Sequence, residues 1–159
     1  MGKYVIGVDI GGTKIASGII SEEGKLVKKT VVPTFAEKGL DVSLGQVYMS
    51  IRDIMETGGV GCGKIAGIGV CAPGPLDPKK GIVHNPPNLP GWREVPLTHL
   101  IKAKFGKRTR LENDANAAGM AELIWGAAKP YKHVFYVTVS TGICTAIIIN
   151  VRIYHGKNG

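Results

Sequence analysis

The segment from Asp9 to Lys14 (DIGGTK) combines the residue types that bind the phosphates of a nucleotide. Gly11 and Gly12 have no side chains, so backbone N–H groups can approach phosphate oxygens, and Thr13 adds a hydroxyl donor. Asp9 ends an apolar run, where its carboxylate would hold Mg²⁺ through water. The spacing is not that of a P-loop, and a simple hairpin turn would also explain the glycines. We interpret the segment as a phosphate-binding turn, because a plain turn needs neither the acid nor the Thr-Lys pair.

A second polar group lies in the segment 111–118 (LENDANAA), where a strand pattern gives way to small helix-forming residues. The Asp114 carboxylate would lie beside a helix N-terminus, which keeps it ionised, and it would face a ligand above the sheet. There it could accept a proton from a sugar hydroxyl during phosphoryl transfer, a reaction that depends mainly on positioning. Asn113 offers a donor and an acceptor to neighbouring hydroxyls. The alternative is that Asp114 only caps the helix.

Residues 72–92 form a long proline-rich stretch between two strand patterns, and we expect no regular element within it. Loops of this length in a compact domain are usually functional. The backbone of Gly74 and the amides of Asn85 or Asn88 are candidate sugar ligands. Trp92 either stacks on a sugar face or anchors the loop by packing.

A third glycine-containing turn, Ser140-Thr141-Gly142, resembles a partner of the first phosphate turn. Thr141 and Gly142 would contact phosphate in the same way as the first turn, but a single glycine makes this signal weak. The histidines show no metal-ligand spacing, and we interpret His84, His99, His133 and His155 as surface or packing residues.

The elements that must position these residues follow from hydrophobic periodicity. Three β-branched runs separated by glycine turns predict an antiparallel meander over residues 4–32. Apolar residues at helical spacing predict one helix over 44–54, and further helices are expected over 97–105 and 115–125. Strands are predicted over 64–71 and 108–112, and a final hairpin over 133–150. The order indicates an α/β protein with a mixed sheet, a βββαβα core and covering helices.

Bulk properties narrow the function classes. The chain has 159 residues, 44% hydrophobic and 20% charged, with a net charge of +8. The basic residues are dispersed and lack interleaved aromatics, so the charge favours an anionic nucleotide over nucleic acid. Three widely spaced cysteines predict neither a disulfide framework nor a zinc site. No signal peptide or membrane span is visible, so we expect a cytoplasmic protein without a membrane partner.

Together, DIGGTK, the stretch from APGPLD to NPPNLPGW, and ENDANAA resemble the ROK family over residues 4–159. This family contains sugar kinases that use ATP and Mg²⁺, and its fold is that of the actin-like (ribonuclease H-like) ATPases. The resemblance implies a catalytic base at Asp114 and a domain boundary there, with an amino-terminal lobe over 1–114 and the start of a second lobe over 115–159. The remaining implied roles are phosphate binding by Asp9, Gly11, Gly12, Thr13, Lys14, Thr141 and Gly142, and hexose binding by Gly74, Asn88, Asn113 and Asp114.

The departures from the family pattern concern completeness. Members are much longer, so the resemblance implies an amino-terminal half whose cleft is completed by a second copy or a second polypeptide. Cys144 and Ala146 also stand where the family has glycines in the second phosphate turn. Three hypotheses remain: a hexose kinase impaired by truncation, an inactive sugar-binding or self-associating module, and a sugar-responsive regulator. The regulator is the least favoured, because the chain starts on its first strand without a preceding helix-turn-helix.

Overall fold

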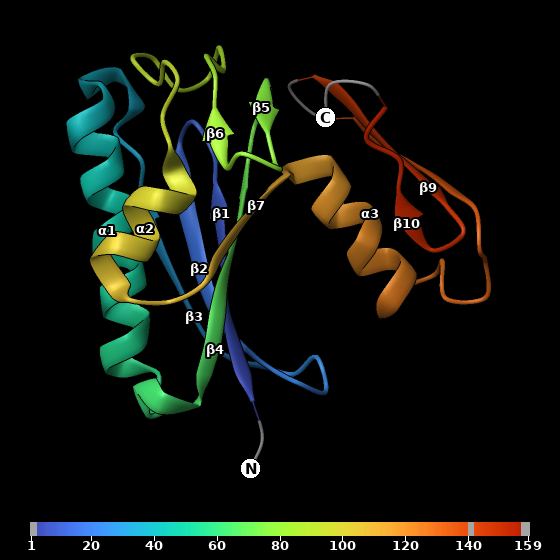
Figure 1. Ribbon diagram of the computed structural model, residues 1–159, viewed down its shortest axis with the longest axis horizontal. Coiled ribbons are helices and arrows are strands. Elements are labelled where there is room, and N and C mark those ends of the chain that lie inside the picture. Colours follow the sequence, from blue (N-terminus) through green and yellow to red (C-terminus); the bar gives the residue numbers. More distant parts are fainter. Residues whose placement is uncertain (1–2, 140–141, 157–159) are drawn as a thin grey trace.

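The computed structural model describes residues 3–139 and 142–156. A five-stranded sheet with the order β3-β2-β1-β4-β7 forms its larger part (Figure 1). The antiparallel meander is β1 (Tyr4–Ile10), β2 (Lys14–Ser21) and β3 (Leu26–Pro33). Strands β4 (Ile65–Ala72) and β7 (Thr109–Asn113) then add to β1 in parallel. The predicted mixed sheet is confirmed.

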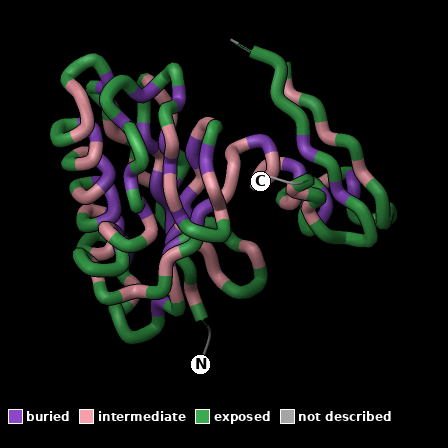
Figure 2. The backbone as a smooth tube through the Cα atoms, turned by 45° about the horizontal axis from the view of Figure 1, so that its top comes forward, coloured by how far each residue is buried: buried purple, intermediate pink, exposed green. Residues whose placement is uncertain are grey.

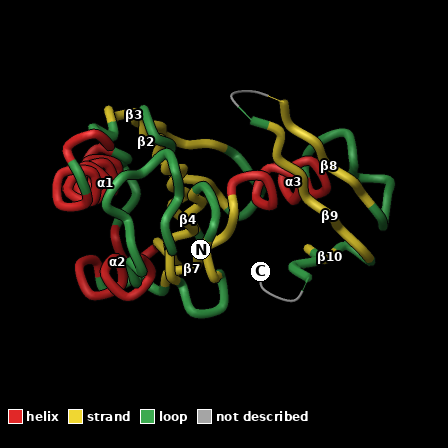
Figure 3. Tube along the Cα trace, turned by 90° about the horizontal axis from the view of Figure 1, so that it is seen from above, coloured by secondary structure: helices red, strands yellow, loops and turns green. Residues whose placement is uncertain are grey.

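Helices α1 (Leu40–Thr57) and α2 (Leu97–Phe105) cover one face of this sheet, as the view along the strands shows (Figure 3). Val47, Ile51 and Ile54 of α1 are fully buried, as their helical spacing predicted. They join a core with alternate residues of the strands, such as Ile6 and Ile19. Burying this face is the main favourable term for the fold.

The opposite face of the sheet carries small residues in its central strands. Gly7 of β1 pairs with Gly18 of β2 and with Gly69 of β4, so three glycines form one row across the sheet. Arg110 of β7 extends the row at one end, and Lys29 of β3 extends it at the other. The space above Gly69 is open, whereas the side chains of Ile20 and Leu26 reach over Gly7 and Gly18, so side chains leave only part of this face uncovered.

The remaining elements form a smaller second unit. Helix α3 (Asp114–Ile124) packs on a three-stranded sheet of β8 (Val134–Val139), β9 (Ile143–Ile149) and β10 (Arg152–Ile153). Gly119 permits this approach, since an added Cβ there would lie 3.1 Å from the Cβ of Ala146. Most of the described residues of the β8–β9 hairpin are exposed (Figure 2).

The proline-rich stretch differs from expectation in one respect. It contains two short strands, β5 (Leu76–Asp77) and β6 (Ile82–Val83), which pair with each other. The Asp77 side chain closes their turn by accepting hydrogen bonds of 2.9 Å from the backbone N–H groups of Lys79 and Lys80. This local turn chemistry allows a hairpin whose turn contains Pro78.

Candidate active site

The candidate site lies where the parallel strands β1, β4 and β7 end. Asp9 pairs with Cys71, Cys71 pairs with Glu112, and the next residue of β4 pairs with Asn113. Since the carboxyl ends of parallel strands meet at one edge, Asp9 and the start of α3 lie along the same edge. Ligands of open α/β sheets bind at such edges.

The turn between β1 and β2 is braced by a residue that the sequence did not single out. The buried Thr34 donates its hydroxyl to the carbonyl oxygen of Gly11 at 2.7 Å, and its backbone N–H to the carbonyl oxygen of Thr13 at 3.0 Å. The N–H of Gly11 itself donates to the carbonyl oxygen of Lys14 at 3.0 Å. The predicted phosphate turn is therefore held rigidly, and the N–H of Gly11 is already engaged within it.

Two glycines bring the proline-rich stretch 72–92, the sugar loop, against the two polar segments 9–14 and 111–118. A Cβ on Gly12 would lie 2.7 Å from the carbonyl oxygen of Asn88, closer than real Cβ atoms approach. A Cβ on Gly74 would lie 3.7 Å from Nδ2 of Asn113. The first turn, the loop and the β7–α3 junction are thus neighbours, although they are far apart in the sequence.

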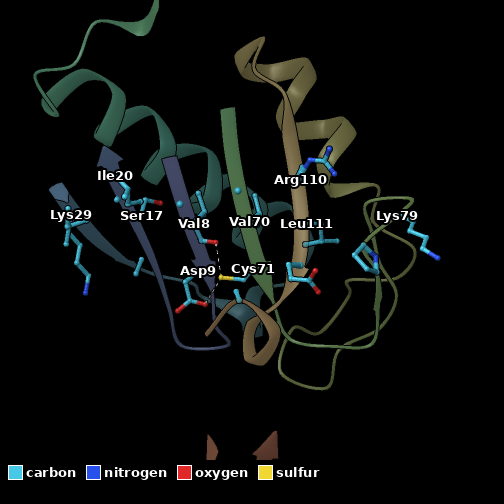
Figure 4. A pocket seen from close by; sticks show the side chains of 18 of the residues that line it. Val8, Asp9, Ser17, Ile20, Lys29, Val70, Cys71, Lys79, Arg110 and Leu111 are labelled. Carbon is cyan, nitrogen blue, oxygen red and sulfur yellow. Dashed lines mark hydrogen bonds between the residues drawn. The ribbon is translucent and has the colours of Figure 1, made fainter. Parts of the chain in front are cut away.

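The two candidate acids are close enough to influence each other. The pKa of Asp9 is raised above its usual value, first by partial burial and then by the negative charge of Asp114. The thiol of Cys71 lies 3.7 Å from Oδ1 of Asp9, where the thiol is the donor (Figure 4). Burial, followed by the Asp9 charge, raises the pKa of Cys71 to about 12, so this thiol stays protonated at neutral pH.

Asn113, and not Asp114, is the N-cap of α3. Its Oδ1 accepts hydrogen bonds from the backbone N–H groups of Ala115 at 3.0 Å and Asn116 at 3.4 Å. Asn113 has the extended conformation of a cap residue, so the helix begins at Asp114. Only Nδ2 of Asn113 is left for a ligand, which corrects the expectation of a donor and an acceptor. Asp114 accepts from the N–H of Ala115 through Oδ1 at 2.8 Å.

Glu112 and His155 are site residues that the sequence reading missed. Nε2 of His155 lies 2.9 Å from Oε2 of Glu112, so this histidine is not a plain surface or packing residue. Glu112 also accepts from the N–H of Asn113 at 3.0 Å and from Nδ2 of Asn116 at 2.9 Å, both through Oε1. The alternation along β7 places Glu112 on the same face as Arg110, and this signal was available in the sequence.

Two cavities adjoin these residues. A cavity of about 720 Å³ lies over the uncovered face of the large sheet and includes Asp9 and Glu112. Basic side chains of Lys29, Lys79 and Arg110 also line this cavity (Figure 4). A smaller cavity of about 270 Å³ lies between the β7–α3 junction, the proline-rich loop and β9, and Gly74 and Asn113 line it.

The structure answers the question about Trp92 but leaves the second phosphate turn untested. Trp92 is fully buried and donates its indole N–H to Oγ of Ser43 at 2.7 Å, so it anchors the loop and is not available for stacking. Thr141 lies outside the described residues. Gly142 is exposed, and an added Cβ there would meet nothing within 4 Å, so phosphate contact by this turn stays a prediction.

Two features are absent from residues 3–139 and 142–156. No group of three or more His, Cys, Asp or Glu side chains is arranged to hold a metal ion. No helix in this part of the chain is long and apolar enough to cross a membrane.

Comparison with known proteins identifies the fold and the family. Residues 5–159 match the ROK family. Glucokinase of Thermotoga maritima is 35% identical over 98% of this chain and 47% of its own length, and the xylose repressor of Bacillus spizizenii is 33% identical over 98% and 40%. A ROK family glucokinase from Streptomyces griseus, solved with glucose and AMPPNP, superposes with a TM-score of 0.87 at 32% identity, covering 98% of this chain and 47% of that one.

These relatives show which fold the chain has and how much of a relative's length it spans. The larger unit and the start of the second correspond to the actin-like ATPase fold of ROK sugar kinases, as the resemblance implied. The chain spans about half the length of the relatives it matches, in agreement with the expected amino-terminal half. From its motifs, its fold and the match over residues 5–159, the chain belongs to the ROK family.

Proposed function

We propose that this chain forms the nucleotide-phosphate and hexose half of an ATP-dependent hexose kinase. The observation that carries the proposal is the position of Asp9 and Asp114 at one edge of the sheet, Asp9 near the end of β1 and Asp114 directly after β7. The direction of the pKa shift of Asp9 agrees with this arrangement. The glycine turn and the sugar loop contact each other beside these acids. The family relatives that are glucokinases support the same reaction class.

In the proposed reaction, Asp114 is the general base. Its carboxylate accepts the proton of a hexose hydroxyl while that oxygen forms a bond to the γ-phosphorus of ATP. The bond from the γ-phosphorus to the bridging oxygen breaks, so the products are a hexose phosphate and ADP. Since the transition state is loose, the main tasks of the protein are orientation and charge stabilisation.

The residues present fit a magnesium ion near Asp9. A partly buried carboxylate whose ionised form is disfavoured by a second acid gains stability from a nearby cation. Mg²⁺ keeps most of its waters and needs only one or two carboxylates besides the phosphates, so the absence of a three-ligand cluster among the described residues agrees with it. When bound, the ion would neutralise charge on the phosphate oxygens, and Asp9 would hold it through water.

The remaining predicted ligands have complementary roles. Gly12, Thr13 and Lys14 would contact the phosphates from the first turn, and Thr141 and Gly142 from the second. Gly11 would only leave room for the phosphates, because its N–H is already bonded to the carbonyl oxygen of Lys14. The amide of Asn88, Nδ2 of Asn113 and the backbone of Gly74 would bind hexose hydroxyls. The relative position of Gly74 and Asn113, which line one cavity, supports the sugar assignment.

An ADP-release assay with Mg-ATP and a panel of hexoses, glucose first, tests this function. We expect hexose-dependent ADP release from the chain combined with a polypeptide that completes the cleft, and much less from the chain alone, because catalysis needs groups on both sides of the phosphoryl group. A hexose that raises the melting temperature without turnover in either sample would favour the alternative, an inactive sugar-binding module. A response of this kind would also suit a regulator, such as the xylose repressor among the relatives.

We further propose that the chain associates with a second copy or a second polypeptide. The uncovered face of the β8–β9 hairpin is apolar and exposed, with Phe135, Val139 and Ile143 each at least 66% exposed. Contiguous apolar surface of this kind marks interaction sites. Light scattering of the purified chain is expected to give at least twice the monomer mass of 16.8 kDa. A monomer at high concentration would exclude the homodimer.

A further inference from the structure

The carboxylate of Glu112 is surrounded by hydrogen-bond donors from three directions. Oε1 accepts from the backbone N–H of Asn113 and from Nδ2 of Asn116, and Oε2 lies 2.9 Å from Nε2 of His155. The side chains of Glu112 and His155 are 25% and 28% exposed, so the pair is mostly shielded from water. Shielded, charge-assisted hydrogen bonds are stronger than exposed ones.

Glu112 determines how α3 begins. In a usual capping box, a glutamate at the third helical position accepts from the N–H of the N-cap residue. Here Asn113 is the cap, the third helical position is Asn116, and Glu112 precedes the cap. Glu112 takes the acceptor role of the missing glutamate, and the Asn116 side chain donates to the same oxygen. The backbone at Asn113 and Asp114 is therefore held by Glu112.

His155 reaches this junction from the second sheet. It follows β10, and the preceding residue is tied to β9 through a hydrogen bond of 2.8 Å from the N–H of Tyr154 to the carbonyl oxygen of Ile147. The pair thus joins residues that are 43 positions apart and connects the end of the described chain to β7. Both partners line the 270 Å³ cavity together with Gly74 and Asn113.

We infer that His155 is a positioning residue of the sugar site. Its imidazole holds the Glu112 carboxylate, which in turn fixes the N–H of Asn113 and the first turn of α3, so that Nδ2 of Asn113 and the carboxylate of Asp114 face the bound hexose. His155 acts through Glu112, whose carboxylate it holds. The part of this inference that concerns hexose rests on the proposed function, whereas the effect on Asn113 does not.

Substitutions at His155 test the inference by calorimetric titration with glucose. The His155→Ala variant is expected to bind glucose at least about tenfold more weakly, which is the lower limit for one lost hydrogen bond to a charged group. The His155→Gln variant keeps an amide N–H at a similar reach, so we expect it to restore affinity to within about threefold of the original chain. The surface substitution His99→Ala on α2 is the control and should change nothing.

A second measurement does not depend on sugar binding. Hydrogen exchange of the Asn113 amide should be faster in His155→Ala than in the original chain, and normal in His155→Gln. Equal glucose affinity in the original chain and His155→Ala would overturn the inference. If the original chain binds no glucose, the proposed function fails for it. In that case the exchange measurement alone decides the role of His155, and an unchanged exchange rate at Asn113 in His155→Ala would overturn the inference. If His155→Ala does not fold, His155→Asn replaces it, since its shorter amide cannot reach Glu112.

Discussion

Replacing Asp114 by asparagine is expected to lower the turnover of hexose phosphorylation by about a hundredfold to ten-thousandfold, the usual contribution of a general base. Asparagine keeps the shape of the side chain and an oxygen that can accept from the N–H of Ala115, as Oδ1 does at 2.8 Å in the original chain. Hexose affinity should therefore change by only a few fold. The measurement is kcat and KM for ADP release from the complete assembly.

The fold itself should tolerate this substitution. Removing a negative charge at a helix N-terminus costs about 0.3–1 kcal/mol. The same change removes the repulsion that raises the pKa of Asp9, which offsets part of that cost. A thermal unfolding midpoint close to the original value would show that the loss of turnover is not a loss of structure.

Asp41→Asn is the matched control for Asp114→Asn. Asp41 also lies in the first turn of a helix, but of α1, and it is exposed. It should lose the same helix-dipole interaction without any change in turnover. Equal kcat in Asp114→Asn and in the original assembly would remove Asp114 from the role of base.

Several parts of the site could be predicted from the sequence because their causes are local. The strand patterns before Asp9 and Asn113 place both residues at strand ends, and parallel strands end at the same edge. The spacing of Val47, Ile51 and Ile54 determines which face of α1 is buried. The proximity of Asp9 and Asp114 follows from these strand ends only once β1, β4 and β7 pair in parallel, and that pairing is a long-range contact.

The parts that were missed depend on packing between distant segments. Thr34 is 23 positions from Gly11, and His155 is 43 positions from Glu112. No local pattern determines that these pairs meet. Trp92 is a related case, because its choice between stacking and packing depends on Ser43, a residue of α1 that lies 49 positions away. The sequence could not decide between Asn113 and Asp114 as the helix cap for another reason. Both are good cap residues, and only the backbone conformation shows which of them is the cap.

Replacing Asp9 by asparagine is expected to change function and stability in opposite directions. The loss of the carboxylate should weaken Mg-ATP binding about 10–100-fold, as for other groups that orient a metal through an intervening ligand. Without metal, however, the substituted chain should be more stable at pH 7. The reason is that burial and Asp114 raise the pKa of Asp9, so its ionised form is disfavoured in the folded state.

The pH dependence follows from the direction of this pKa shift. The folded-state pKa of Asp9 lies above its unfolded value of 3.8, so its contribution to stability is fully present below that value. The contribution is lost as the pH rises through the folded-state pKa. Since Asp9 keeps contact with solvent, the effect is modest. In metal-free buffer, the free energy of unfolding should therefore fall more steeply with rising pH above 3.8 in the original chain than in Asp9→Asn.

Asp77→Asn is a control, because the pKa of Asp77 is shifted in the opposite direction to that of Asp9. Hydrogen bonds from the backbone of Lys80 and Lys79 lower the pKa of Asp77, so its ionised form stabilises the turn above the unfolded pKa and loses this effect as the pH falls. Asp77→Asn should therefore be slightly less stable at pH 7 and should keep its affinity for Mg-ATP. Denaturant titrations with and without Mg²⁺, combined with nucleotide binding, separate the two carboxylates. If Asp9→Asn loses stability without metal and binds Mg-ATP as the original chain does, Asp9 is a structural residue of the β1–β2 turn and not part of a cation site.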